Sequence, residues 1–204
     1  MATDLQNAYW NHNTAFHNEI LRKCSATSGA VLDVGCGDGL LLGRLARTGR
    51  PVVGVEPDPV AAALARRRCS GVSNAAVVEA DFMDAGLDDS SLGFVAMVAT
   101  LHHMDTRAAL NRAVDMLEVG GKLYLLGLTR IETCRDLAFA IRSLPRARIV
   151  GALRSEQWPD GVPVADPMQT FEEVRRDVET VLVGARLRRR PYYRFSLEWT
   201  KPSN

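Results

Sequence analysis

Three acidic residues stand where short apolar runs end, and their positions suit the binding of a polar ligand. Asp33 lies in a first apolar run, Glu56 ends a second and Asp81 follows a third. Carboxylates accept hydrogen bonds from hydroxyl and amino groups. In a parallel sheet the carboxyl ends of neighbouring strands meet at one edge. Acids at three successive strand ends therefore predict one binding site, although each could instead cap a turn.

A glycine-rich turn follows the first apolar run directly. It holds three glycines at alternate positions, Gly35, Gly37 and Gly39. Glycine tolerates positive φ and lets a ligand approach the backbone closely. No lysine occurs between Lys23 and Lys122, so the turn is not a Walker loop. The dinucleotide-binding pattern requires a glycine where this chain has Leu40, which disfavours a nicotinamide-dependent oxidoreductase.

Two adjacent histidines follow the fourth apolar run. Imidazole titrates near neutral pH, so His102 and His103 are candidates for a general base. The alternative is that one histidine packs structurally and the other shapes the pocket. No Asn/Asp-Pro-Pro-Tyr signature of amino-methylating enzymes follows this strand, and no set of ligands predicts a metal site.

The ordered pattern over about residues 28–128 resembles the class I S-adenosylmethionine (SAM)-dependent methyltransferases. The features that carry the resemblance are the glycine turn, the acids that end the second and third strands, the Thr100–His103 loop and the Gly120-Gly121 turn. It implies that Glu56 holds the ribose hydroxyls, that Asp81 accepts from the adenine amino group, and that Asp33 orients the methionine end. The cofactor-binding residues implied by the resemblance are Asp33, Gly35, Gly37, Glu56, Asp81, Phe82 and Thr100.

Length and composition predict a single soluble α/β domain. The chain has 204 residues, 47% of them apolar, and a net charge of +1. This balance gives no general attraction to nucleic acid or membrane. The four cysteines form no C-x-x-C pair, no signal peptide precedes the first strand, and no apolar run approaches about 18 residues. We therefore expect a cytoplasmic protein, either a monomer or a homodimer.

Strand and helix signals alternate along the chain, which predicts a Rossmann-like, seven-stranded, mostly parallel sheet with helices on both faces. Asp105 or Thr106 can cap a helix that is expected to run to about Leu117, with Gly120-Gly121 ending it. Residues 186–190 and 193–200 predict an antiparallel C-terminal hairpin, which the resemblance also implies. Within one domain, residues 1–204, we expect four parts: a helical lid (1–27), the cofactor-binding core (28–128), an inserted arm (129–169) and a final helix and hairpin (170–204).

The first 27 residues predict one amphipathic helix. Half of the histidines fall here, beside an aromatic pair. The helix either packs on the sheet edge with its polar side chains in water or covers the site as a lid, as in small-molecule members of the family. The candidate lid and substrate-contacting residues are Tyr9, Trp10, His12 and His17.

The activity expected from these features is methyl transfer from SAM to a small-molecule acceptor, with O-methylation favoured over N- or C-methylation. The alternatives are an RNA or protein methyltransferase and a cofactor-binding protein that no longer transfers methyl. The arginines at 66–68 and 186–194 could contact RNA, but solvated positions at a helix end and a sheet edge explain them better.

Overall fold

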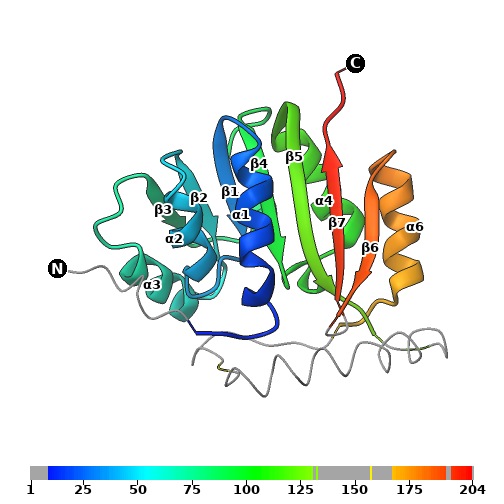
Figure 1. Cartoon of the computed structure of the whole chain (residues 1–204), viewed down its shortest axis with the longest axis horizontal. Coiled ribbons are helices and arrows are strands. Elements are labelled where there is room, and N and C mark those ends of the chain that lie inside the picture. The colour runs from blue at the N-terminus through cyan, green and yellow to red at the C-terminus, as the bar shows by residue number, and fades with distance from the viewer. Residues whose placement is uncertain (1–8, 131, 133–156, 158–166, 192–193, 204) are drawn as a thin grey trace.

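Seven strands pair into one mixed sheet in the computed structural model, which describes residues 9–130, 132, 157, 167–191 and 194–203 (Figure 1). The spatial order is β3-β2-β1-β4-β5-β7-β6. β7 is antiparallel to β5 and β6, so the other six strands share one direction. The strands are β1 (Ala30–Val34), β2 (Val52–Val55), β3 (Ala75–Val78), β4 (Leu92–Val98), β5 (Leu117–Leu128), β6 (Arg186–Arg190) and β7 (Arg194–Thr200). The predicted mostly parallel sheet with a C-terminal hairpin is confirmed.

The central strands are buried because helices cover both faces of the sheet. The first six residues of β4 are all buried, as expected for a parallel strand between two layers. The strand order reverses between β1 and β4, since β1 pairs with β2 on one side and β4 on the other. In open α/β sheets, ligands bind outside the carboxyl ends of the strands at such a reversal.

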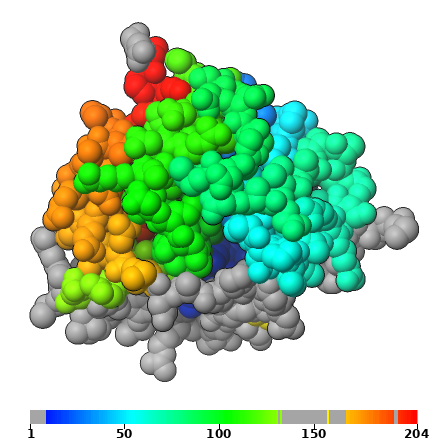
Figure 2. Space-filling view, turned by 180° about the vertical axis from the view of Figure 1, so that it is seen from behind, coloured from blue at the N-terminus to red at the C-terminus, as the bar shows by residue number. Residues whose placement is uncertain are grey.

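Five described α-helices form the two outer layers (Figure 1). On one face lie α1 (His17–Ser25), α2 (Leu40–Ala46) and α3 (Pro59–Arg68), packed over a core that includes Ile20, Leu42 and Ala65. On the other face lie α4 (Thr106–Met116) and α6 (Phe171–Val181), packed over a core that includes Leu110 and Val174. In Figure 2, α4 in green and α6 in orange lie side by side. None of the helices in the described ranges has the length and apolar content needed to cross a bilayer.

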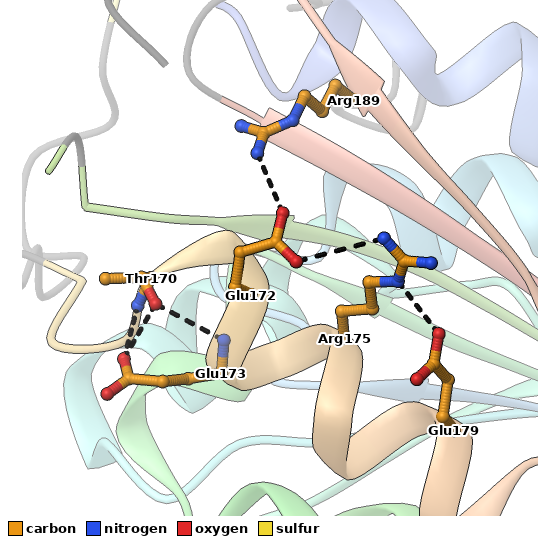
Figure 3. A network of polar contacts seen from close by, with 6 residues as sticks. All are labelled: Thr170, Glu172, Glu173, Arg175, Glu179 and Arg189. Carbon is orange, nitrogen blue, oxygen red and sulfur yellow. Dashed lines mark hydrogen bonds and ion pairs between the residues drawn. The ribbon is translucent and has the colours of Figure 1, made fainter. Parts of the chain in front are cut away.

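A reciprocal cap and a chain of ion pairs fix α6 (Figure 3). The Thr170 hydroxyl accepts from the Glu173 N–H, while the Glu173 carboxylate accepts from the Thr170 N–H at 2.8 Å. This capping box satisfies N–H groups that a helix start leaves unpaired. Glu172 contacts Arg189 of β6, so the helix is tied to the edge strand.

The start of the described chain differs from the predicted single helix. Tyr9–Asn13 is not helical; a 3₁₀ turn, η2 (Thr14–Phe16), precedes α1. The side chain of Asn11 accepts from the backbone N–H groups of Asn13 and Thr14, and Thr14 Oγ1 accepts from the Asn11 N–H. These side-chain bonds compete with helix formation. Residues 1–8 lie outside the described residues.

The helix predicted from Asp105 or Thr106 to about Leu117 is confirmed as α4, but Gly120-Gly121 does not end it. α4 ends at Met116, and β5 begins at Leu117, which pairs with Leu92. The glycines lie within β5, where Gly120 has a φ of +81° and the register with β4 shifts. Pairing with β4 therefore extends the strand across the glycines, which form a bulge. Most of the expected arm at 129–169 lies outside the described residues.

Candidate active site

A cavity of about 440 Å³ lies at the carboxyl ends of β1 to β5. Its described walls come from distant parts of the chain: the N-terminal segment, the end of β1 with the glycine turn and the start of α2, the loops after β2, β3 and β4, the last residue of β5 and the first residue of β7. In Figure 2, dark blue atoms of the N-terminal segment are visible in a hollow between the green and cyan surfaces. Segments far apart in sequence thus meet around one space.

The conformation of the glycine turn is fixed by contacts with β2 and with the loop after β4. Gly35 has a φ of +65°, and its N–H donates to the carbonyl of Val55 at 2.8 Å. A Cβ built on Gly35 would lie 2.1 Å from Oγ1 of Thr100. Glycine is required here because the loop after β4 packs directly on the turn.

Glu56 joins the glycine turn to the loop after β2. One carboxylate oxygen accepts from the N–H of Gly37 at 2.9 Å, and the other accepts from the N–H of Asp58 at 3.1 Å. Each oxygen keeps acceptor capacity, because a carboxylate offers about four lone-pair positions. The side chain is buried apart from its contact with the cavity. Glu56 is therefore fixed in place with lone pairs left to accept further hydrogen bonds.

Asp33 is the most deeply buried acid of the cavity, with 1% of its surface exposed. Its Oδ2 atom accepts no hydrogen bond from the described residues. Burial, followed by the nearby Glu56 and Asp38, raises the pKa of Asp33 to about 8. A carboxyl group in this position would gain most from a cationic ligand, which would favour its ionised form.

Asp81 and Phe82 close the same end of the cavity after β3. Asp81 is exposed, and its Oδ1 accepts from the N–H of Met83 at 2.8 Å, which caps the 3₁₀ turn η3 (Phe82–Asp84). Phe82 is buried and lines the cavity. The pair offers one carboxylate and one apolar surface, a combination that suits a heteroaromatic base.

Asp38 is a site residue that the sequence interpretation missed. Its Oδ1 accepts from the Tyr9 hydroxyl at 3.1 Å, and its Oδ2 lies 2.5 Å from Arg68. Arg68 was expected to be solvated at the end of α3, but it is largely buried against Asp38. In contrast, the half-exposed Arg66 pairs with Glu79. Asp38 thus links the N-terminal segment, the glycine turn and α3.

The loop after β4 carries the two histidines. Ala99 has a φ of +53°, unusual for a residue with a side chain and worth about 1 to 3 kcal/mol of strain. The 3₁₀ turn η4 (Leu101–His103) follows, and its imidazole rings lie 4.1 Å apart between centroids. His102 is half-buried and His103 is exposed, and both line the cavity.

The remaining wall joins the two ends of the chain. Arg194, the first residue of β7, donates from Nε and Nη2 to the side-chain oxygen of Asn13 at 3.0 and 2.7 Å. Asn11 donates to the carbonyl of Gln157. Arg194, Asn11 and Asn13 all line the cavity, and no sequence motif marks them.

Most of the predicted site residues meet around this cavity. Those that line it are Tyr9, His17, Asp33, Gly35, Gly37, Glu56, Asp81, Phe82, Thr100, His102 and His103. Trp10 and His12 are not among the lining residues; their rings pack edge to face at 5.7 Å. Within the described part of the chain, no cluster of three or more histidine, cysteine or acidic residues has a metal-binding arrangement.

The residues present fit SAM. The unpartnered oxygen of Asp33 suits a cationic group, and Glu56 suits a ribose diol. Asp81 and Phe82 offer a hydrogen-bond acceptor and an apolar surface for an adenine ring. These groups lie in one cavity at the strand reversal where such ligands bind.

Comparison with known proteins agrees with this geometry. Residues 32–125 match the model of a methyltransferase domain family. An uncharacterized methyltransferase of Mycobacterium tuberculosis is 34% identical over 199 residues, which cover 95% of this chain and 98% of that protein. A ubiquinone biosynthesis O-methyltransferase of Xanthomonas oryzae is 33% identical over 128 residues, 57% of this chain and 52% of that protein.

The fold also matches a solved structure. A SAM-dependent methyltransferase from Aquifex aeolicus superimposes with a TM-score of 0.63 at 18% identity, over 90% of this chain and 88% of that one. The resemblance seen in the sequence is confirmed, and SAM is the cofactor. The chain belongs to the class I SAM-dependent methyltransferases.

Proposed function

We propose that this enzyme methylates a small-molecule acceptor, with oxygen as the favoured attacking atom. The observation that carries the proposal is the composition of the cavity: five acids line it, Asp33, Glu56 and Asp81 among them, and a pair of histidines lies on the loop after β4. The partial similarity to an O-methyltransferase of ubiquinone biosynthesis supports an oxygen acceptor. The net charge of +1 gives no general attraction to RNA, which favours a small acceptor.

The acidic end is assigned to the cofactor. We assign Glu56 to the ribose hydroxyls, Asp81 and Phe82 to the adenine, and Asp33 to the methionine end. Gly37 holds Glu56 in position, and Gly35 allows Thr100 to approach the turn. SAM, when bound, supplies a methyl group already activated on a positively charged sulfur. The protein's part is therefore to orient two ligands in line and to exclude water.

The histidine end is assigned to the acceptor. A hydroxyl group must lose its proton as its oxygen attacks, and an imidazole near neutral pH is suited to accept that proton. His102 and His103 stand at the carboxyl end of β4, next to the glycine turn that Thr100 contacts. Because His103 is exposed, it can pass a proton on to water.

Methyl transfer to a panel of hydroxylated aromatic compounds, with an isotopically labelled methyl donor and mass spectrometry, tests the proposal. We expect an O-methylated product. We expect kcat to fall by about 100-fold or more in whichever of His102→Ala and His103→Ala removes the base. His12→Ala is the matched control, because His12 does not line the cavity, and it should retain activity.

Other outcomes of the same assay would contradict the proposal. Transfer to tRNA or rRNA with a steep dependence on salt would assign the enzyme to nucleic acid. O-methylation that persists in both histidine variants would remove the general-base role. Products methylated at carbon or nitrogen alone would overturn the preference for oxygen.

A further inference from the structure

His17 lines the same cavity as the two histidines of η4 but comes from the N-terminal part of the chain. It is the first residue of α1 and follows the turn η2, which the side-chain bonds of Asn11 hold in place. Its side chain is 4% exposed, and it lines the cavity. Two structural elements thus fix this histidine in the wall of the cavity.

Arg44 of α2 determines which nitrogen of His17 carries hydrogen. The guanidinium Nη1 lies 3.1 Å from Nδ1 of His17. Arginine has N–H donors and no acceptor, so it must donate to a lone pair on Nδ1. A neutral imidazole whose Nδ1 accepts carries its hydrogen on Nε2. His17 is therefore held as the Nε2–H tautomer.

The charges near His17 keep the ring neutral. Burial, reinforced by the positive charge of Arg44, lowers the pKa of His17 to about 3. The groups that influence Arg44 are Arg47 on α2, Tyr9 of the N-terminal segment and Arg68 on α3. Asp38, an acid that lines the same cavity, is paired with Arg68 and accepts from Tyr9. Protonating His17 would place a further cation beside these arginines.

The ring makes one hydrogen bond with the side chains that the structure describes, and Arg44 covers its Nδ1 edge. Nε2–H is therefore the remaining polar group of a ring that lines the cavity. We infer that His17 presents a fixed N–H donor to the acceptor and selects molecules with a lone-pair oxygen beside the group that is methylated. This inference rests on the proposed function, because it needs the acceptor to bind at this end of the cavity.

The inferred role differs from that of a base. A base must take a proton, but His17 has its one lone pair engaged by Arg44. Its contribution is specificity: an acceptor with a carbonyl, ether or second hydroxyl oxygen in the right place gains a hydrogen bond, and one without it leaves a buried N–H unpaired. Arg44 is then a positioning residue, which acts through His17.

Nitrogen NMR of histidine-labelled, ligand-free enzyme tests the tautomer without any assay of activity. We expect His17 to show the Nε2–H form and no titration between pH 5 and 9. In Arg44→Met, the ring should exchange between tautomers, and its pKa should rise toward 6.5. A wild-type His17 that titrates near neutral pH, or that carries hydrogen on Nδ1, would overturn the inference and leave the proposed methyl transfer untouched.

Calorimetry with the enzyme loaded with S-adenosylhomocysteine (SAH) tests the donor role. The probes are catechol, which carries a second oxygen beside the reacting hydroxyl, and phenol, which lacks it. His17→Phe should weaken catechol binding by about tenfold and change phenol binding little. His17→Gln, whose amide supplies an N–H, should recover part of the loss. Unchanged SAH affinity in both variants confirms that the cofactor end is intact.

Two results of this titration would overturn the inference. One is an equal loss for catechol and phenol in His17→Phe, which indicates packing alone. The other is a wild-type enzyme that does not prefer catechol to phenol. Failure of the proposed function is separate, because it appears as the absence of methylated product in the labelled-methyl assay.

Discussion

The acidic end and the histidine end of the cavity are built from contacts of different range. At the acidic end, Glu56 binds the backbone of Asp58 two residues away and of Gly37 nineteen residues away. At the other end, Asn11 reaches Gln157 across 146 positions and Arg194 reaches Asn13 across 181. The first end can form once two adjacent strands are paired. The second requires both ends of the chain to be in place.

The two ends also hold their buried groups neutral in opposite ways. Burial raises the pKa of Asp33 to about 8, so the acid is largely protonated in the ligand-free enzyme at neutral pH. Burial lowers the pKa of His17 to about 3, so the base is unprotonated. The acid is suited to a cationic cofactor, which would favour its ionised form, and the histidine to a neutral acceptor with an oxygen lone pair.

The largest expected effect is the loss of SAH affinity when the acidic end is disrupted by one substitution. Glu56→Gln should weaken SAH binding by about 100-fold, because the amide loses the negative charge and turns an N–H₂ group toward the N–H of Gly37 or Asp58. Calorimetric titration with SAH measures it. Glu79→Gln is the matched control, since Glu79 is half-exposed and pairs with Arg66 at the surface. Equal affinities for the two variants would contradict the assignment of the acidic end.

The next effect is the change of folding stability with pH, which has opposite signs for Asp33 and for His17. Between about pH 4 and 8 the folded protein binds more protons at Asp33 than the unfolded chain does, so its stability falls as pH rises. Asp33→Asn should remove this fall and raise the Tm of the ligand-free enzyme most at pH 8 and above. Between about pH 3 and 6.5 the unfolded chain binds more protons at His17, so stability is lost as pH falls. His17→Gln should reduce that acid-side loss.

Thermal denaturation of the ligand-free wild type and both variants from pH 4 to 9 measures these slopes. Each variant serves as the control for the other, because only Asp33→Asn should change the slope above about pH 6.5, whereas between pH 4 and 6.5 the two variants should change it in opposite directions. A Tm gain in Asp33→Asn that is as large at pH 4 as at pH 8 would show that ionisation of Asp33 is not its cause.

The residues of the acidic end are easier to predict from the sequence than those of the histidine end, because their contacts are closer in sequence. Asp33 lies near the end of a short apolar run and Glu56 and Asp81 follow two others, so local periodicity suffices to place them at one edge of the sheet. The ion pair between Asp38 and Arg68 was missed because the three arginines of α3 are alike in sequence, and packing against the glycine turn distinguishes the third. The sequence signal that could have indicated this pair is Asp38 itself, an acid within the glycine turn.

Fewer sequence patterns mark the residues of the acceptor end. His17 was a candidate because histidines cluster near the N-terminus, but its partner Arg44 belongs to a different helix, and no motif joins them. The helix predicted over residues 1–27 also failed at Tyr9–Asn13, where the side-chain bonds of Asn11 override apolar periodicity. Tertiary contacts decide this end, and they are not visible in local patterns.

The smallest expected effect is a change in SAH affinity when the contact between Tyr9 and Asp38 is removed. Tyr9→Phe removes the hydrogen bond from the phenol to Asp38 while keeping the ring. One such bond contributes about 1 kcal/mol, so SAH affinity should fall by a few-fold, as measured by calorimetry. Trp10→Phe, next to it in sequence and outside the cavity wall, should bind SAH as the wild type does. A Tyr9→Phe enzyme with unchanged affinity would remove the N-terminal segment from the cofactor site.

A crystal structure of the enzyme with SAH bound tests the central claim most directly, namely that one cavity carries the cofactor at its acidic end and the acceptor at its histidine end. The account predicts the ribose hydroxyls on Glu56, the amino group of the homocysteine beside Asp33, and the sulfur facing His102 and His103. A nucleoside bound away from Glu56, or a sulfur turned from the two histidines, would contradict it.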